Sequence, residues 1–345
     1  MPNAIVLMTA LVPTIGHKYL IDFATNLVKP NGTVHVIVGT MDREPIRGDL
    51  RFIAIKKAYR VNGYVKVHHL RRDVPQEPSE HPDFWNLWRD IVGEFVDVKP
   101  DDYFVASELY GIDMARVLGC RFMPCNRYRE TIPIKGSDVR ADILGNFRYI
   151  LPEFQPYLRK VVTTFGAESC GKTTMARRLA RDLDGWFVPE WAREYLETVG
   201  TEVTDERMAD IVIGQAAAQD TAYLKLRDKP WIFQDTDLLS TVGYYRLWGG
   251  DKRTDMARIE QMANERGSDL YVVMSDQIPF EQDPLRYGGT GRESGMRFWV
   301  DLLEEFGAEY LVVPAADHET QAAMVRDHLL RWYADDTRHI VDFRR

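Results

Sequence analysis

The chain has 345 residues, of which 45% are hydrophobic and 28% charged, and its formal net charge is −8. This length suits two domains with a core each, and the acidic balance argues against a general nucleic-acid-binding surface. The 3 cysteines show no metal-ligand spacing and no apolar run approaches membrane-spanning length, so we expect a reduced, soluble, cytoplasmic protein.

In chain order, strand-like and helix-like segments alternate from one end of the chain to the other. The expected strands are residues 4–10, 33–39, 65–70, 103–107 and 121–124 in the first part, and 161–165, 185–188, 231–233, 270–274 and 309–313 in the second. This alternation predicts an α/β protein with parallel sheets that are covered by helices on both faces. We place a boundary near residues 151–159, which gives domains of residues 1–155 and 156–345.

Two apparent helix starts in the first domain carry residues that suit phosphate. The string Thr14-Ile15-Gly16-His17 follows the first strand, and Ser137 and Arg140 begin another helix late in the domain. An imidazole or a guanidinium beside free amide groups would suit adenylyl transfer, in which negative charge builds up on the α-phosphate. A helix-capping or packing role is the alternative for His17.

The second domain opens with a complete phosphate-loop motif. Residues 166–173 read Gly-Ala-Glu-Ser-Cys-Gly-Lys-Thr, between an apolar strand and an amphipathic helix. The glycines allow a tight turn whose amide groups face a triphosphate, Lys172 would reach the β- and γ-phosphates, and Thr173 would ligate Mg²⁺. The expected phosphate-binding residues are Gly166, Ser169, Gly171, Lys172, Thr173 and Thr174. ATP and Mg²⁺ are therefore the expected cofactors.

These motifs resemble known enzymes. The first-domain motifs are similar to the T/H-x-G-H and S-x-x-x-R signatures of the nucleotidylyltransferase superfamily, and residues 104–119 resemble nicotinamide mononucleotide (NMN) adenylyltransferases. Residues 189–195 and 234–237 resemble segments of ribosylnicotinamide kinases. Both domains, in this order, are similar to the bifunctional NadR-type enzymes of bacteria. NadR-type regulators carry a DNA-binding domain before the transferase, whereas this sequence starts directly at the first strand, so a repressor role is not expected.

The resemblance implies a Rossmann-like nucleotidylyltransferase domain followed by a P-loop kinase domain. The kinase would phosphorylate nicotinamide riboside to NMN, and the transferase would convert NMN and ATP to NAD and pyrophosphate. Small-molecule substrates are the expected partners, without nucleic acid or membrane, and homo-oligomerisation is left open. Three alternatives stay open. The first is a fused pantetheine-phosphate adenylyltransferase and dephospho-coenzyme A kinase, the second is a nucleotide-sensing regulator that turns over neither ligand, and the third is one active domain beside one retained for binding.

In the transferase, the resemblance implies that His17 and Arg140 stabilise the reacting phosphates, with Thr14, Gly16 and Ser137 as further phosphate contacts. Thr14 replaces the first histidine of the common H-x-G-H form and carries no positive charge. The remaining candidates are substrate contacts, each with a structural alternative. Arg47, with Arg51, would contact the mononucleotide or lie on a solvated helix start, and Trp85 and Trp88 would stack on the cationic nicotinamide ring or pack in the core.

In the kinase, Glu190 follows the second strand and is the expected general base, and Asp235 ends the third and would organise Mg²⁺. Asp237 would share that role or hold the ribose, and Arg193 would contact substrate. Any of these acids could instead cap the next helix, so which one is the base is left open. Residues 283–297 are rich in glycine and arginine and predict a lid over ATP, or else a surface loop. Its arginines are Arg286, Arg292 and Arg297, with Arg292 as the phosphate contact.

Overall fold

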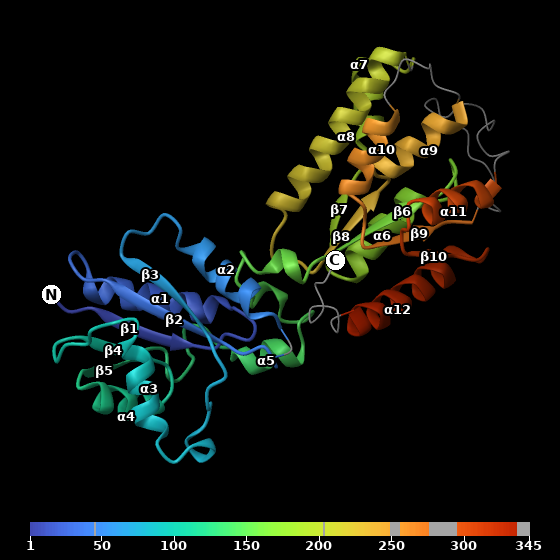
Figure 1. Cartoon of the computed structure of the whole chain (residues 1–345). Coiled ribbons are helices and arrows are strands. Elements are labelled where there is room, and N and C mark those ends of the chain that lie inside the picture. The colour runs from blue at the N-terminus through green and yellow to red at the C-terminus, as the bar shows by residue number, and fades with distance from the viewer. Residues whose placement is uncertain (45, 203, 249–255, 276–294, 337–345) are drawn as a thin grey trace. The chain divides into compact units, whose positions relative to one another are not determined.

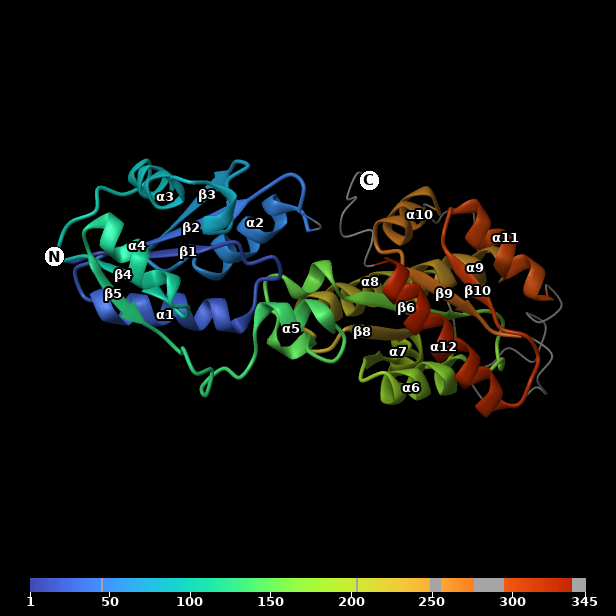
Figure 2. The same cartoon turned by 90° about the horizontal axis from the view of Figure 1, so that it is seen from below.

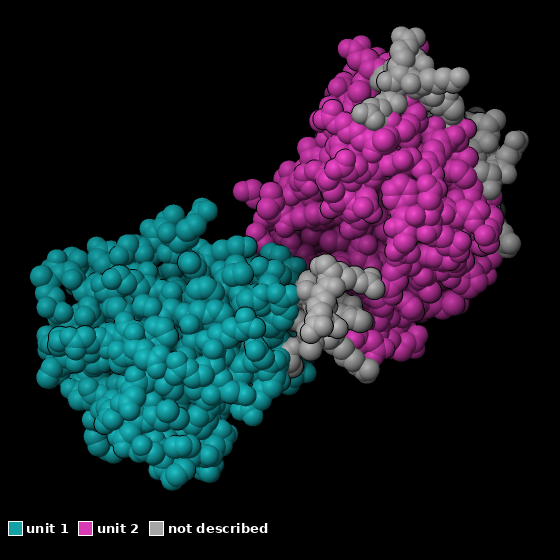
Figure 3. Space-filling model, in the orientation of Figure 1, with its two compact units in different colours: residues 1–158, 336–345 teal, residues 159–335 magenta. Residues whose placement is uncertain are grey.

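The computed structural model describes residues 1–44, 46–202, 204–248, 256–275 and 295–336 (Figure 1). The chain forms two compact units, residues 1–158 and residues 159–335, which are coloured separately in Figure 3. Each unit contains one five-stranded sheet in which all strand pairs are parallel. The expected α/β class with two parallel sheets is confirmed, and all ten expected strands are present.

The sheet of the first unit has the order β3-β2-β1-β4-β5. Its strands are β1 (Ala4–Met8), β2 (Val34–Thr40), β3 (Val65–Arg71), β4 (Tyr103–Ala106) and β5 (Arg121–Pro124). β1 lies between β2 and β4, with Ala4 opposite both Val34 and Tyr103. The strand order reverses at this point, and such a reversal leaves a crevice at the carboxyl ends of the two central strands.

Helices cover both faces of this sheet. They are α1 (Ile15–Val28), α2 (Gly48–Ala58), α3 (Phe84–Gly93), α4 (Tyr110–Leu118) and the short α5 (Gly136–Ala141). Val6 of β1 belongs to a core that includes residues of α1 and α2, whereas Ile5 belongs to a second core with α3 and α4. Successive side chains of β1 therefore enter two different cores, which explains why this strand is apolar at every position.

The second unit has the strand order β10-β9-β6-β8-β7. Its strands are β6 (Lys160–Phe165), β7 (Trp186–Val188), β8 (Trp231–Asp235), β9 (Leu270–Val273) and β10 (Tyr310–Val312). Its helices are α6 (Lys172–Asp182), α7 (Trp191–Val199), α8 (Asp205–Lys225), α9 (Leu238–Trp248), α10 (Met256–Glu265), α11 (Gly295–Glu305) and α12 (His318–Asp336). β6, the first strand of the unit, is therefore the central strand of the sheet. The segment that follows β6 lies at the middle of the edge formed by the carboxyl ends of the strands.

Different helices cover the two faces of this sheet (Figure 2). On one face, Phe165 meets Trp299 of α11 edge-on, with ring centroids 5.2 Å apart, in a core that also includes residues of α8, α9 and α10. On the other, Trp231 packs on Tyr333 of α12 at 5.1 Å. Among the described residues, no helix has the length and apolarity needed to cross a membrane.

Candidate functional site

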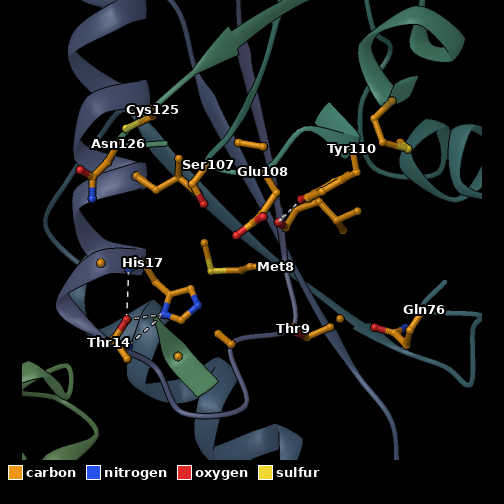
Figure 4. Close-up of a pocket in the computed structure, with 18 of the residues that line it drawn as sticks. Met8, Thr9, Thr14, His17, Gln76, Ser107, Glu108, Tyr110, Cys125 and Asn126 are labelled. Atoms are coloured by element: carbon orange, nitrogen blue, oxygen red, sulfur yellow. Dashed lines mark hydrogen bonds between the residues drawn. The ribbon is translucent and has the colours of Figure 1, made fainter. Parts of the chain in front are cut away.

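A cavity of about 680 Å³ opens in the first unit at the carboxyl ends of its central strands (Figure 4). Met8 and Thr9 line it from the end of β1, and Ala106 and Ser107 from the end of β4. This is the crevice that the reversal of strand order creates. Of the residues singled out in the sequence, five line the cavity: Thr14, Gly16, His17, Trp85 and Trp88.

His17 is held by the first turn of α1, where it forms a reciprocal capping arrangement with Thr14. The backbone N–H of Thr14 donates to His17 Nδ1 at 3.0 Å, and the Thr14 hydroxyl lies 2.8 Å from the same nitrogen. In return, the backbone N–H of His17 donates to Thr14 Oγ1 at 3.4 Å. Because a backbone N–H can only donate, Nδ1 is the acceptor and the neutral ring carries its proton on Nε2.

The electrostatic surroundings also favour the neutral imidazole. Burial, together with the charges of Arg129 and Arg140, lowers the pKa of His17 to about 4. In Figure 4 the ring faces the cavity between Thr14 and Met8. His17 can therefore donate a hydrogen bond to a bound anion at neutral pH, and the arginines supply the positive charge.

Thr14 serves as the orienting residue of this arrangement. It is the N-cap of α1, is 3% exposed, and its hydroxyl contacts His17. The two hydrogen bonds that its hydroxyl makes with His17 favour a positioning role over direct phosphate binding. Gly16 leaves space beside the helix start, since a Cβ there would meet only Thr14 Oγ1 at 3.4 Å and Ile132 Cγ2 at 3.7 Å.

The second helix start of the first unit lies next to the first. A Cβ placed on Gly136 would be 3.7 Å from His17 Cε1 and 3.8 Å from Arg140 Nη1. The structure thus brings together His17 and Arg140, which are more than a hundred positions apart in the sequence. Ser137 is exposed and its hydroxyl donates to Asp138 Oδ1 at 3.3 Å.

Arg129 also lines the cavity, and no sequence motif pointed to it. Its guanidinium donates to Glu108 at 2.5 Å, and its backbone has a left-handed φ of 55°. Asn126 ties the same loop together, because its side chain bonds to the backbone of Thr131 and Ile132. Arg127, only two positions away, is exposed and lies over Tyr128. Residue type alone could not distinguish these two arginines.

The two tryptophans differ in their surroundings. Trp88 is 5% exposed, and its indole N–H donates to the carbonyl of Pro75 at 3.0 Å, as expected for a core residue that reaches the cavity wall. Trp85 is half-buried and packs edge-on against Phe84 at 5.0 Å. Of the pair, Trp85 has the more accessible ring.

Arg47 and Arg51 are both occupied with local contacts. Arg47 pairs with Asp49 at the start of α2 and is not among the described residues that line the cavity. Arg51 is fully buried, where it donates to the carbonyl oxygen of Thr9 at 2.6 Å and pairs with Glu44. Arg51 therefore fixes the chain where it leaves β1, which favours a structural role.

In the second unit, the phosphate loop connects β6 to α6. Gly166 and Gly171 have positive φ values of 127° and 86°, and Ser169 adopts 56°. A Cβ on Gly166 would lie 3.2 Å from the Met274 carbonyl oxygen, so both its φ and its surroundings call for glycine. Thr174 is exposed in the first turn of α6.

Lys172 lies back against its own loop. Its Nζ donates to the carbonyl oxygens of Gly166 at 3.0 Å and Ala167 at 2.6 Å, and to the Tyr244 hydroxyl at 3.2 Å. Burial alone would lower the pKa of Lys172, but Tyr244, Cys170 and the acids Glu190 and Asp235 outweigh it and raise the pKa above its ordinary range. The ammonium group is thus kept charged beside the loop that would hold a triphosphate.

Thr173 and Asp235 meet at the end of the central strands. The Thr173 hydroxyl donates to Asp235 Oδ2 at 2.5 Å, and Asp235 is 3% exposed at the end of β8. A hydroxyl and a carboxylate are hard oxygen donors of the kind that Mg²⁺ takes from proteins when phosphates and water supply the rest. These two residues fit a magnesium ion bound together with a nucleotide. Within the described part of the chain, no cluster of three or more His, Cys, Asp or Glu residues could hold a metal by itself.

Glu190 precedes α7 without capping it. It occupies the N-cap position, yet its side chain makes no capping hydrogen bond. Burial and the like charge of Asp235 raise the pKa of Glu190 to about 7, while Lys172 and Arg193 oppose the shift. This carboxyl group is therefore poised to exchange a proton near neutral pH, which suits a general base.

Asp237, by contrast, caps a helix. Its Oδ1 accepts from the backbone N–H of Ser240 at 2.9 Å, and its Oδ2 accepts from the Tyr271 hydroxyl at 2.7 Å. Asp237 is only 1% exposed, and its contacts favour a capping role over ribose binding. Arg193 pairs with Glu197 at 3.5 Å on the first turns of α7.

The expected lid falls mostly outside the described residues. Arg286 and Arg292 lie in the undescribed range 276–294, so their positions are not part of the structure. Arg297 lies on α11, where it pairs with Asp301 at 2.6 Å and is largely exposed.

Comparison with known proteins extends these observations over almost the whole chain. Residues 161–321 match the AAA domain family. The trifunctional NAD biosynthesis/regulator protein NadR of Escherichia coli K12 is 24% identical over 329 residues, which cover 89% of this chain and 77% of that protein. The NadR protein of Salmonella typhimurium LT2 is also 24% identical, over 88% of this chain and 77% of its own length.

The fold is shared with solved NadR structures. A NadR protein in complex with NR aligns with a TM-score of 0.67 at 22% identity, over 96% of both chains. A NadR protein in complex with NAD and AMP-PNP aligns with a TM-score of 0.65 at 22% identity, over 96% of this chain and 97% of that one. This chain is therefore a NadR-like protein, with a NadR-like fold along both units and an AAA-type P-loop unit in its C-terminal half.

Proposed function

We propose that this chain is a bifunctional enzyme of NAD salvage. Residues 156–345 would phosphorylate nicotinamide riboside, and residues 1–155 would join the resulting NMN to the adenylyl group of ATP. The observation that carries the proposal is the cluster of Lys172, Thr173, Asp235 and Glu190 around the phosphate loop, which unites triphosphate binding with a titrating base. The likeness to NadR over both units supports the second activity.

The transferase reaction needs no general base. The 5′-phosphate of NMN is already ionised at neutral pH, attacks the α-phosphorus of ATP, and displaces pyrophosphate. The residues then have to orient the two nucleotides and offset negative charge. The Nε2–H of His17 would donate to a phosphate oxygen, and Arg140 and Arg129 would supply positive charge beside it.

The kinase reaction does need a base. The 5′-hydroxyl of the riboside attacks the γ-phosphorus of ATP, its proton passes to Glu190, and ADP leaves. Lys172 would leave the loop carbonyls to contact the β- and γ-phosphates, which present stronger acceptors than a carbonyl. Thr173 and Asp235 would hold Mg²⁺, which when bound offsets phosphate charge.

One incubation tests the proposal. The purified protein is mixed with nicotinamide riboside, ATP and Mg²⁺, and the products are separated by chromatography over time. We expect NMN to appear first and NAD to follow with pyrophosphate. If riboside is not consumed, the kinase assignment is wrong, and if NMN accumulates without NAD, the transferase assignment is wrong. When phosphopantetheine or dephospho-coenzyme A replaces nicotinamide riboside as the acceptor, the protein should consume no ATP.

A further inference from the structure

Gln215 is a buried side chain on α8 that has a hydrogen-bond donor to spare. It is 2% exposed. Its Oε1 accepts the backbone N–H of Trp191 at 3.2 Å. Its Nε2 has no partner among the residues that the structure describes. Since a backbone N–H can only donate, the contact fixes which end of the amide is oxygen and leaves the NH₂ group as the free end.

The contact with Gln215 lies at the first turn of α7, immediately after Glu190. Trp191 is the first residue of α7, and its N–H is satisfied by Gln215 from the neighbouring helix. The two helices approach closely here, because a Cβ on Gly214 would lie 2.1 Å from the Trp191 ring. The spare NH₂ group is therefore held beside the residue that directly follows Glu190.

Gln219, one turn further along α8, provides an internal contrast. It is fully buried too, but its Nε2 donates to the Tyr223 hydroxyl at 3.3 Å and its Oε1 accepts the Leu238 N–H at 3.1 Å. A buried donor without an acceptor weakens the fold, and such groups are rare in native proteins. Gln215 is one of several described residues with an unpartnered buried polar atom, and it differs from Gln219 in that its free Nε2 lies at the start of α7, beside Glu190.

We propose that Gln215 Nε2 donates a hydrogen bond to a hydroxyl oxygen of the sugar of the nucleoside that binds at Glu190. This inference rests on the proposed kinase activity and names a residue that determines specificity for its acceptor. An acceptor whose 5′-hydroxyl faces Glu190 brings its sugar to the start of α7, where the Gln215 amide is fixed. A sugar hydroxyl oxygen accepts from an amide N–H, whereas an apolar or deoxygenated acceptor would leave the donor unsatisfied.

The test compares two buried glutamines on one helix. Nicotinamide riboside is titrated calorimetrically into wild type, Gln215→Met and Gln219→Met, and steady-state KM values for riboside and ATP are measured alongside. We expect Gln215→Met to weaken riboside binding and raise its KM about tenfold, the loss of one hydrogen bond, without changing the KM for ATP. Gln219→Met should lower the unfolding temperature more than Gln215→Met does, and leave riboside affinity unchanged.

Two further measurements keep the test sharp. Gln215→Glu retains an oxygen for the Trp191 N–H and, at a pH where the introduced carboxyl group is ionised, removes the donor, so the folded variant should lose riboside affinity there. The second measurement uses 2′-deoxy and 3′-deoxy ribosides. One of the two should bind wild type more weakly than the parent riboside does. The same analogue and the parent riboside should bind Gln215→Met with equal affinity. If Gln215→Met binds riboside as tightly as wild type, the inference is overturned while the kinase stands. If wild type neither binds nor phosphorylates riboside, the proposed function falls first and the inference falls with it.

Discussion

In the first unit, burial and two arginines lower the pKa of His17 to about 4, whereas in the second unit burial and Asp235 raise the pKa of Glu190 to about 7. Both environments favour the neutral form, but the consequences differ. His17 stays a hydrogen-bond donor at every pH near neutrality, while Glu190 changes charge there. The difference matches the two acceptors: an ionised phosphate needs only donors and charge, and a hydroxyl needs a base that can take its proton.

The two sites also differ in how they are held before ligands bind. His17 is locked by Thr14 through hydrogen bonds in both directions, so the donor is already oriented. Lys172 instead bonds to the Gly166 and Ala167 carbonyls, which ATP phosphates would replace. The first site is prepared by a helix cap, and the second by a temporary set of backbone acceptors.

The largest expected effect comes from removing the base. Glu190→Gln should reduce kinase kcat at pH 8 by about 10²- to 10⁴-fold and leave the transferase unchanged. An acid with a raised folded-state pKa stabilises the fold at low pH and loses that contribution as pH rises from its ordinary pKa of 4.5 towards about 7. The variant should therefore unfold at a higher temperature than wild type at pH 8. Glu194→Gln, an exposed change one turn later, is the control for both measurements.

Lys172→Ala should separate the two activities next. Loss of a charged donor to the transferred phosphate should lower riboside phosphorylation by about 10²- to 10³-fold. NAD formation from supplied NMN should continue at the wild-type rate, because that reaction uses the other unit. Equal loss of both activities in a folded variant would contradict the assignment of one activity to each unit.

Arg129→Gln and Arg127→Gln form a matched pair for the first unit. Arg129 lines the cavity and Arg127 does not, so only Arg129→Gln should slow adenylyl transfer, by roughly 10- to 100-fold, the value of a charge-assisted hydrogen bond. The reverse reaction, with pyrophosphate and NAD, should be slowed as well. Equal rates in the two variants would remove Arg129 from the site.

Thr14 should give the smallest effect. Thr14→Val loses the hydroxyl that caps α1 and contacts His17, which should cost about 1 kcal/mol in the free energy of unfolding, with a several-fold lower transferase rate. Thr14→Ser keeps the hydroxyl and should behave like wild type in chemical denaturation and in the assay. A Thr14→Val protein with unaltered stability would mean that the cap is not formed.

Local patterns predicted most of this fold. Each expected strand is present because buried parallel strands are apolar runs bounded by turn residues, and such runs are visible in a single sequence. The end of the strand expected at residues 4–10 was misplaced by two residues, because Ala10 adopts a positive φ of 44° and the chain turns after Met8. The strand expected at residues 231–233 continues through Gln234 to Asp235, the residue expected at its end.

The phosphate loop could be predicted because the spacing of its glycines, lysine and threonine along the sequence determines the loop conformation. Other residues of the two sites could not be predicted, because they come from distant segments. Tyr244 contacts Lys172 from α9, Gln215 reaches the start of α7 from α8, and Arg129 enters the first cavity from a loop held by Asn126. None belongs to a short motif, so only the folded chain reveals them.

The most direct test of the account is the pH dependence of both half-reactions in one preparation. We would measure kcat/KM for riboside phosphorylation and for NAD formation from NMN between about pH 5.5 and 9. We expect a kinase rate that rises with pH through about 7, with the slope abolished in Glu190→Gln, and a transferase rate with no step due to His17. A kinase rate that does not change with pH, or a transferase rate that titrates near pH 6.5 and loses that step in a His17 variant, would contradict it.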